Sequence, residues 1–316
     1  MNKKNIIVTG GTGFIGSHLV EELVKKKLNV VVLDLKIHSN SYFEKTKLKN
    51  RVTLEFVDIR DRAKLEKIFL KYDPRAIFHL AAEPIVDNAF SNPVSTFETN
   101  IMGTVNVLEI SRKLKNLEIV IVASSDKAYG KTKEKYSENH PLRGDHPYDV
   151  SKSCADLIAN TYFKTYNLPV AITRFGNVYG EGDIHMDRIV PGICQSVVNK
   201  EKLLIRSDGT FVRDYLYVKD VVEGYLFLLS NYGKIKGEAF NFSSKDKLSV
   251  LGMIKKASKT LKVDIKYEIQ NIAKNEIPYQ HLDDSKVRKL GWSNKFLFKE
   301  AIGNTYNWYK NNLKNV

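Results

Sequence analysis

The sequence has few cysteines and no long apolar run. Cys154 and Cys194 are the only cysteines among 316 residues. Two cysteines cannot form a disulfide framework in a chain this long, and neither has the spacing of a metal ligand. We therefore expect both to be reduced and buried, and we predict no metal site. No stretch approaches the ~20 apolar residues that a membrane span needs. The apolar run Ile6–Val8, after the basic segment Met1–Lys4, is too short for a signal peptide, so we expect a cytoplasmic protein without a membrane partner.

Acidic residues are also in short supply relative to basic ones. The chain has 50 Lys and Arg against 36 Asp and Glu, a formal net charge of +14. This excess either attracts a phosphorylated or polyanionic ligand or simply forms a solvated lysine-rich surface. The densest lysine clusters, 25–27 and 255–256, are short, and no nucleic-acid-binding motif accompanies them. We expect no nucleic-acid partner.

The first half of the chain alternates apolar runs with helical patterns. Strands are predicted at 5–8, 30–33, 53–56, 76–80 and 119–123, and helices at 16–26, 63–70, 96–114 and 151–165. Strands that alternate with helices indicate βαβ units and a parallel sheet covered on both faces. The sequence therefore predicts an α/β fold, a doubly wound Rossmann-type parallel sheet with a smaller C-terminal substrate-binding region.

The pattern changes after about Arg174, where glycines, prolines and irregular stretches increase. We predict an NAD-binding domain over 1–175 and a substrate-binding region over 176–316. Strands are expected at 211–218 and 239–242, and a helix at 221–229. Some of these segments are expected to return to the first domain.

A glycine-rich turn, Thr9–Gly16, closes the first predicted strand and opens the first predicted helix. Gly10 permits a tight turn, Gly13 lets the backbone approach a pyrophosphate, and Gly16 lets the helix pack close to the sheet. The helix N-terminus offers free N–H groups to the phosphates. The alternative is a glycine-rich turn without a ligand. The predicted dinucleotide contacts in this turn are Gly10, Thr12, Gly13, Phe14, Ile15 and Gly16.

Two carboxylates follow the next strands. Asp34 ends the second strand, about 20 residues beyond the glycines, where a carboxylate binds the adenosine ribose and repels a 2′-phosphate. NAD is therefore favoured over NADP, although the nearby Lys36 leaves NADP open. Asp58 and Ile59 follow the third strand. The Asp58 carboxylate either reaches the adenine amine or caps a helix.

Tyr148 and Lys152 lie one helical turn apart and so face the same way. A phenol with a pKa of about 10 needs help to act as a base, and a nearby ammonium stabilises its phenolate. The same spacing occurs elsewhere, at Tyr129/Lys133, Tyr215/Lys219, Tyr232/Lys236 and Tyr306/Lys310. Tyr148/Lys152 differs from these because it opens a helical pattern that follows the strand and loop carrying Ser124–Lys127.

These motifs together resemble those of the extended short-chain dehydrogenases/reductases. The matching stretches are Thr9–Gly16, His79–Pro84, Asn100-x-x-Gly103-Thr104, Ser124–Gly130, Tyr148/Lys152 and Arg213–Asp220, and they run through most of the chain. The resemblance implies that Ser125 hydrogen-bonds a sugar O4, that Tyr148 takes its proton while C4 passes a hydride to NAD⁺, and that Lys152 holds the nicotinamide ribose. It also implies cofactor contacts at Leu80, Ala81 and Ala82.

Asp126 and Lys127 discriminate within that family. Simple 4-epimerases usually carry small or apolar residues here, whereas nucleotide-sugar 4,6-dehydratases carry an acid followed by a base. Oxidation at C4 makes the C5 proton acidic, so the resemblance implies that Lys127 removes it and that Asp126 protonates the departing 6-hydroxyl. Burial beside Lys152 would keep Lys127 neutral part of the time. The alternative is an Asp-Lys turn on the surface.

The C-terminal half is most similar to the CDP-glucose 4,6-dehydratases. The matching stretches are Gly176–Val178, Gly180–Asp183, Asp187–Pro191 and Leu282–Lys286. Phe175 departs from that subgroup, and Arg213-Asp214-Tyr215 is closer to the dTDP-glucose enzymes. The sequence therefore leaves open which nucleotide base the substrate carries.

Four residues are candidates for binding the nucleotide sugar. Asn177, Arg188 and Arg213 resemble the phosphate binders of the family, and Arg suits this because its fork pairs two oxygens at once. Arg213 is alternatively a surface arginine. Glu83 faces substrate or cofactor, or caps a helix.

Three functions are compatible with the sequence: a nucleotide-sugar 4,6-dehydratase, a 4-epimerase of the same family, or a catalytically idle NAD-binding regulator. The intact set of Ser125, Tyr148 and Lys152 argues against the third. By resemblance, the chain is expected to form a homodimer through the helices predicted at 96–114 and 151–165.

Overall fold

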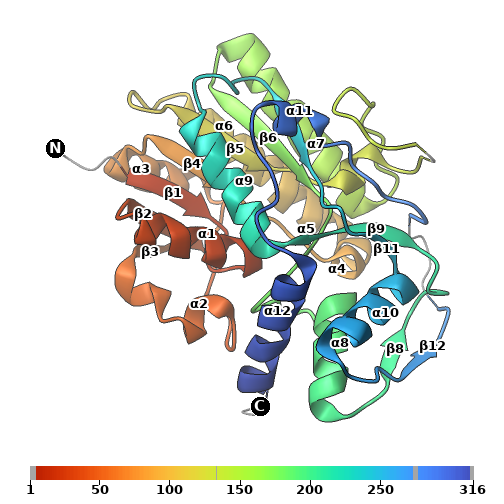
Figure 1. The fold of residues 1–316 in the computed structure, drawn as a ribbon. Coiled ribbons are helices and arrows are strands. Elements are labelled where there is room, and N and C mark those ends of the chain that lie inside the picture. The colour runs from red at the N-terminus through yellow and green to blue at the C-terminus, as the bar shows by residue number, and fades with distance from the viewer. Residues whose placement is uncertain (1–4, 133, 273–276, 314–316) are drawn as a thin grey trace.

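The computed structural model describes residues 5–132, 134–272 and 277–313. The basic segment Met1–Lys4 lies outside these ranges. A parallel sheet of seven strands, in the order β10-β6-β5-β4-β1-β2-β3, forms the centre of the molecule (Figure 1). Its strands are β1 Asn5–Thr9, β2 Asn29–Asp34, β3 Thr53–Phe56, β4 Ala76–His79, β5 Ile119–Ala123, β6 Val170–Phe175 and β10 Ala239–Phe242. The predicted fold class is confirmed.

Helices cover both faces of this sheet, which is why its strands are almost entirely apolar. One face packs against α1 Phe14–Lys25 and α9 Val218–Ser230, and the other against α3 Arg62–Tyr72, α6 Gly103–Ser111 and α7 Pro147–Tyr166. Alternation along β1 divides its side chains between the two cores, with Ile6 and Val8 in one and Ile7 in the other. The short helical segments near these cores are α2 Tyr42–Lys45, η1 Leu48–Arg51, η3 Asp126–Tyr129 and α11 Ser285–Lys289.

The helix predicted over 96–114 is interrupted. It consists of α5 Pro93–Phe97, a π-helical turn over Glu98–Met102 and α6, and it follows α4 Val86–Ser91. The wide turn contains the buried Asn100, whose amide bonds the backbone of Glu83 and the hydroxyl of Ser151. Single π-turns within α-helices often mark functional positions, and here the turn supports the loop after β4.

The remaining segments form a lobe over the carboxyl ends of the strands (Figure 1). It contains the sheet β11-β9-β7 and the pair β12-β8, covered by α8, α10 and α12. The bounds are β7 Asn177–Tyr179, α8 Ile189–Asn199, β8 Leu203–Ile205, β9 Val212–Tyr217, β11 Lys247–Ser249, α10 Val250–Leu261, β12 Tyr267–Ile269 and α12 Phe298–Asn312. Although β10 follows this lobe's first strands in sequence, it pairs with β6 in the central sheet. The predicted boundary after residue 175 stays a prediction.

The cysteines and the surface charge bear on two further expectations. Cys194 is buried, but Cys154 lies at the margin of the buried face of α7 and is partly exposed, so the expectation that both are buried is wrong for Cys154.

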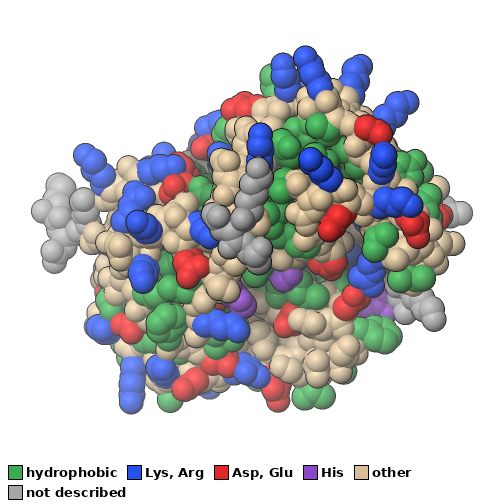
Figure 2. Space-filling view, turned by 90° about the horizontal axis from the view of Figure 1, so that it is seen from below, with side chains coloured by type: hydrophobic (Ala, Val, Ile, Leu, Met, Phe, Trp, Pro, Cys, Tyr) green, Lys and Arg blue, Asp and Glu red, His purple; other side chains and the backbone are tan. Residues whose placement is uncertain are grey.

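Figure 2 shows Lys and Arg side chains spread over the face in view, among acidic ones. Within the described ranges, no helix combines the length and apolar character that a membrane crossing requires.

Candidate active site

A cavity of about 1570 Å³ lies between the carboxyl ends of the central strands and the C-terminal lobe. It extends from the glycine turn after β1, past the ends of β4 and β5, to β8 and the start of β9. The sheet order reverses at β1, and ligands of open α/β sheets bind at such a switch point. Pockets for one small ligand usually measure about 300–1,000 Å³, so this cavity has room for two ligands side by side.

The glycine turn is shaped for close backbone approach. Gly10 has a φ of +70°, in the left-handed region, and a Cβ there would lie 2.7 Å from the amide nitrogen of Ala81. A Cβ at Gly16 would lie 2.1 Å from the carbonyl oxygen of Gly10. The turn therefore closes tightly under the N-terminus of α1, and Thr12, Gly13, Phe14 and Ile15 line the cavity there. This cradle fits the pyrophosphate of a dinucleotide.

Asp34 is held at the end of β2 by three hydrogen bonds. The Thr12 backbone N–H and hydroxyl donate to Oδ2 at 3.0 and 2.7 Å, and the Leu35 N–H donates to Oδ1 at 2.8 Å. The carboxylate lines the cavity beside the glycine turn, where a ribose hydroxyl would meet it.

Asp58 and Ile59 also line the cavity, after β3. The Asp58 carboxylate forms an ion pair with Arg60 at 2.7 Å, and hydrogen bonds from Arg60 lower the pKa of Asp58. The helix cap of α3 is Asp61, whose carboxylate accepts the Lys64 N–H at 3.0 Å. The capping alternative for Asp58 is therefore wrong, while its contact with adenine stays a prediction.

A buried polar chain supports the loop that carries Leu80, Ala81 and Ala82. The His79 ring contacts the Thr9 hydroxyl at 2.8 Å through Nδ1 and the Thr104 hydroxyl at 3.0 Å through Nε2, and Thr9 accepts the Ala81 N–H at 3.3 Å. Burial, aided by the charge of Lys152, lowers the pKa of His79 to about 3, so the ring is neutral. Sequence reasoning did not assign His79 a role, although its place at the end of a parallel strand was a usable signal.

Ser125, Tyr148 and Lys152 come together at the end of β5. The Ser125 hydroxyl lies near the Tyr148 phenol and acts on its pKa, and the Lys152 ammonium donates to the carbonyl of Ala123 at 2.9 Å. Desolvation raises the pKa of Tyr148 to about 12, opposed by the charge of Arg188 and by the Ser125 hydroxyl. Burial lowers the pKa of Lys152 to about 8, opposed by Asp156. Without a further positive charge nearby, this phenol stays protonated near neutral pH.

Asp126 lies beside these groups and is only 3% exposed. Its Oδ1 accepts the Ser125 hydroxyl at 3.0 Å, and its Oδ2 accepts the amide Nε2 of Gln280 at 3.0 Å. Burial raises the pKa of Asp126 to about 6, opposed first by the charge of Lys127. The surface-turn alternative is wrong for Asp126, whereas Lys127 is partly exposed and lines the cavity.

The predicted substrate ligands line the other end of the cavity. Arg213 is only 7% exposed, so the surface-arginine alternative is wrong. Arg188 pairs with the buried Asp183 at 3.0 Å, and Asn177 lines the cavity from β7. Glu83 is partly exposed, and its carboxylate accepts the Ile85 N–H at 3.0 Å, just before α4. The helix-cap alternative is therefore wrong for Glu83, because no side chain among the described residues caps α4 and Glu83 is only half-buried; its contact with substrate or cofactor stays a prediction.

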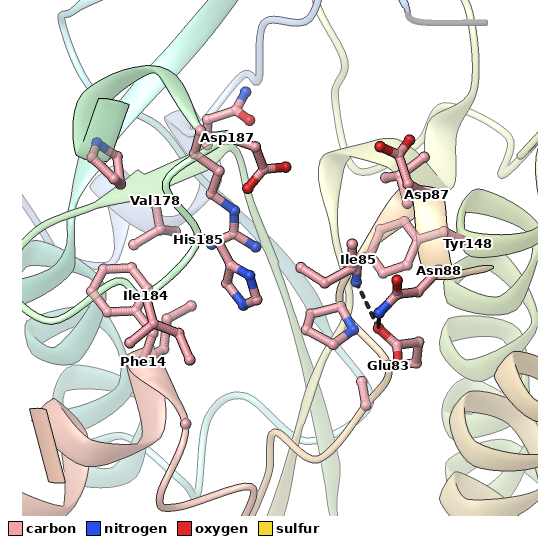
Figure 3. A pocket seen from close by; sticks show the side chains of 18 of the residues that line it. Phe14, Glu83, Ile85, Asp87, Asn88, Tyr148, Val178, Ile184, His185 and Asp187 are labelled. Atoms are coloured by element: carbon pink, nitrogen blue, oxygen red, sulfur yellow. Dashed lines mark hydrogen bonds between the residues drawn. The ribbon is translucent and has the colours of Figure 1, made fainter. Parts of the chain in front are cut away.

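Two walls face each other across the cavity in Figure 3. Glu83, Asn88 and Tyr148 belong to one wall, and His185 and Asp187 to the other. Sequence reasoning did not find His185, which follows the loop residue Asp183 and gave no motif of its own.

The model of the family described as GDP-mannose 4,6 dehydratase matches residues 7–305. A CDP-glucose 4,6-dehydratase from Salmonella typhimurium is 30% identical, over 97% of this chain and 90% of its own length. A putative UDP-glucose 4-epimerase from Methanocaldococcus jannaschii is 32% identical, over 97% of this chain and 99% of its own length.

Solved structures of an epimerase and of a dehydratase are also similar to this chain. The UDP-glucose 4-epimerase of Thermotoga maritima, solved with UDP-glucose, is 28% identical with a TM-score of 0.89, over 98% of this chain and 99% of that one. The dTDP-glucose 4,6-dehydratase of Streptomyces venezuelae, solved with NAD and a second ligand bound, is 28% identical with a TM-score of 0.88, over 98% of each chain. Dehydratases and epimerases are therefore both among the similar proteins.

Proposed function

The chain belongs to the GDP-mannose 4,6-dehydratase family, within the extended short-chain dehydrogenases/reductases, and from this premise we propose that it is an NAD-dependent nucleotide-sugar 4,6-dehydratase acting on a CDP-glucose-like substrate. The observation that carries the proposal is the buried carboxyl of Asp126. With a pKa of about 6, this carboxyl is partly protonated near neutral pH, and it lies beside Ser125 and Lys127. A carboxyl of this kind suits proton delivery to a leaving hydroxyl.

The cavity fits NAD at one end. Gly10, Gly13 and Gly16 would hold the pyrophosphate, Asp34 the adenosine ribose and Lys152 the nicotinamide ribose. When bound, NAD would supply hydride exchange: the hydride that leaves the sugar C4 would return to C6, with a proton returned to C5, so cofactor would not be consumed. NAD is favoured over NADP because the Asp34 carboxylate would repel a 2′-phosphate.

The first step needs a base for the 4-hydroxyl. Tyr148 takes that proton, and the Ser125 hydroxyl, near the phenol, holds O4. The ammonium of Lys152, one helical turn along α7, favours the phenolate through its charge. Arg213, Arg188 and Asn177 bind the diphosphate and keep the hexose over the end of β5.

The second step is the loss of water across C5 and C6. Lys127 takes the C5 proton, which is acidic once C4 is a ketone. Asp126 gives its proton to the departing 6-hydroxyl. A 4-epimerase has no use for this step, so the buried acid favours dehydration although epimerases are also among the relatives.

The experiment is incubation of the purified protein with CDP-, dTDP-, UDP- and GDP-hexoses, followed by the alkaline absorbance of a 4-keto sugar. We expect a 4-keto-6-deoxy product, formed best from CDP-glucose. Interconverted epimers without a keto product would identify a 4-epimerase instead. Tyr148→Phe is the matched control, because it should abolish turnover of every hexose, whereas an idle regulator would show no turnover even with Tyr148 present.

The family relationship also suggests a homodimer. Val94, Met102 and Leu157 lie on α5, the π-helical turn and α7, and are 68, 53 and 54% exposed. Apolar side chains gathered on neighbouring helices favour a protein interface. Leu157→Glu should then convert a dimer to a monomer in sedimentation velocity. A monomeric wild-type protein would exclude this part of the proposal.

A further inference from the structure

The acid proposed above has a partner that comes from far along the chain. Gln280 lies 154 residues after Asp126, in a segment that runs beside β9, where its backbone N–H bonds the carbonyl of Val212 at 3.1 Å. Its side chain is 0% exposed, and its amide Nε2 donates to Oδ2 of Asp126 at 3.0 Å. Its amide Oε1 is buried and has no hydrogen-bond partner among the described residues. Leaving the buried Oε1 unpaired costs free energy. The contact of Nε2 with Asp126 therefore holds the amide in this orientation.

The two carboxyl oxygens of Asp126 have different surroundings. Oδ1 meets the hydroxyl of Ser125, on the side of the predicted O4 site, and a hydroxyl can either donate or accept there. Oδ2 meets an amide N–H, which can only donate. A proton on Oδ2 would point at that N–H, so the neutral acid keeps its proton on Oδ1, next to Ser125.

We propose that Gln280 is a positioning residue for the elimination step: its amide N–H occupies Oδ2 of Asp126, so that the transferable proton sits on Oδ1, facing the bound hexose. This rests on the proposed function, because it assigns Gln280 a role in delivering a proton to the leaving 6-hydroxyl. Gln280 itself is not among the residues that line the cavity.

Other charged and titratable groups also act on Asp126. Lys127 on η3 and Arg213 on β9 favour its ionised form, and Asp214 on β9 disfavours it. The phenols of Tyr148 and Tyr136 are coupled to its charge as well. None of these groups is altered by a change at position 280, so a shift in the pH dependence reports on the amide contact.

The experiment compares Gln280→Met and Gln280→Glu with wild type in single turnovers over a range of pH. The substrate is the nucleotide hexose that wild type dehydrates best. Methionine keeps the shape but removes the donor that stabilises the ionised carboxyl, so the high-pH limb of elimination should move up by about one pH unit, a tenfold change in the ionisation constant. Glutamate adds a like charge and should move it further in the same direction. Because the proton is then no longer confined to Oδ1, elimination at its optimal pH should be slower than in wild type. Oxidation at C4 should keep its wild-type rate in Gln280→Met, so reduced cofactor should accumulate, as measured by its near-ultraviolet absorbance.

Asn294→Leu is the matched control, because it removes an amide that bonds Ser243 and Arg288 outside the cavity. It should keep the wild-type pH dependence. The proposal would be overturned if the high-pH limb of elimination stayed unchanged in both Gln280 variants or moved to lower pH. A shift to lower pH would mean that the amide oxygen of Gln280 faces Asp126. If Gln280→Met does not fold in a thermal unfolding scan, Gln280→Glu carries the test. Failure of wild type to form a keto sugar would contradict the proposed function instead, before Gln280 is tested.

Discussion

Asp126→Asn should make the protein more stable at neutral and alkaline pH while blocking its chemistry. Burial raises the pKa of Asp126 from an ordinary 3.8 to about 6. The folded protein therefore binds more protons than the unfolded chain between these values, and the contribution of this group to stability falls as pH rises through that window. A shift of about two units, at 1.36 kcal/mol each, corresponds to a penalty of about 3 kcal/mol above pH 7.

Asparagine has the same shape and carries no charge at any pH. Its amide oxygen can accept from Gln280, and its amide nitrogen can donate to Ser125, so the two contacts of Asp126 are preserved. We therefore expect Asp126→Asn to exceed wild type by about 3 kcal/mol in free energy of unfolding at pH 8, and by only about 0.5 kcal/mol at pH 4. Urea denaturation of both proteins without ligands, at pH 4, 6 and 8, measures this difference. A difference independent of pH would refute the reasoning, because it would mean that Asp126 is not a buried, charge-penalised carboxyl.

Three further changes test other parts of the site and core. Gly16→Ala should abolish stabilisation by NAD in a thermal-shift assay, because the new Cβ would lie 2.1 Å from the Gly10 carbonyl oxygen; retained stabilisation would contradict the tight turn. Asp156→Asn should lower the free energy of unfolding by about 3–5 kcal/mol in urea, because it removes the counter-charge of the buried Arg174 guanidinium, and a loss below about 1 kcal/mol would contradict burial of this ion pair. Lys152→Met should stabilise the ligand-free protein at pH 7, since burial lowers the pKa of Lys152 to about 8 and so disfavours the folded protein that carries the ammonium. The gain in free energy of unfolding should fade between pH 8 and 10.5. A gain that persists at pH 10.5 would be inconsistent with burial of the ammonium as its cause.

Local sequence patterns predicted six of the seven strands of the central sheet and the glycine turn, but not β6 Val170–Phe175. The predicted strands 53–56, 119–123 and 239–242 coincide with β3, β5 and β10. For β5 the reason is that a strand buried on both faces is a continuous apolar run with clear ends. Helix ends were less well predicted. The helix expected from Ser151 begins at Pro147, since proline suits the first turn although it breaks helix interiors.

The interruption by the π-helical turn had no local signal. Nothing in the sequence 96–114 marks Glu98–Met102 as different from an α-helix. The wide turn is associated with long-range contacts, since the Asn100 amide bonds Glu83 and Ser151, which lie 17 and 51 residues away. Periodicity describes only neighbours along the chain, so it cannot predict such a turn.

Patterns along the chain also could not predict which distant residues determine the acidity of the predicted site residues. Ser125, Asp126 and Lys127 were found because they are consecutive and resemble a family motif. The acidity of Asp126, however, depends on its burial and on Arg213, 87 residues further along the chain, and its Oδ2 contacts the amide of Gln280, 154 residues further along. A motif therefore identifies which group transfers a proton, whereas its proton affinity at a working pH is set by side chains that only the folded chain assembles. Relatives that share the Asp-Lys pair but have an apolar residue in place of Gln280 should consequently eliminate water with a different pH dependence, even where every residue of the motif is the same.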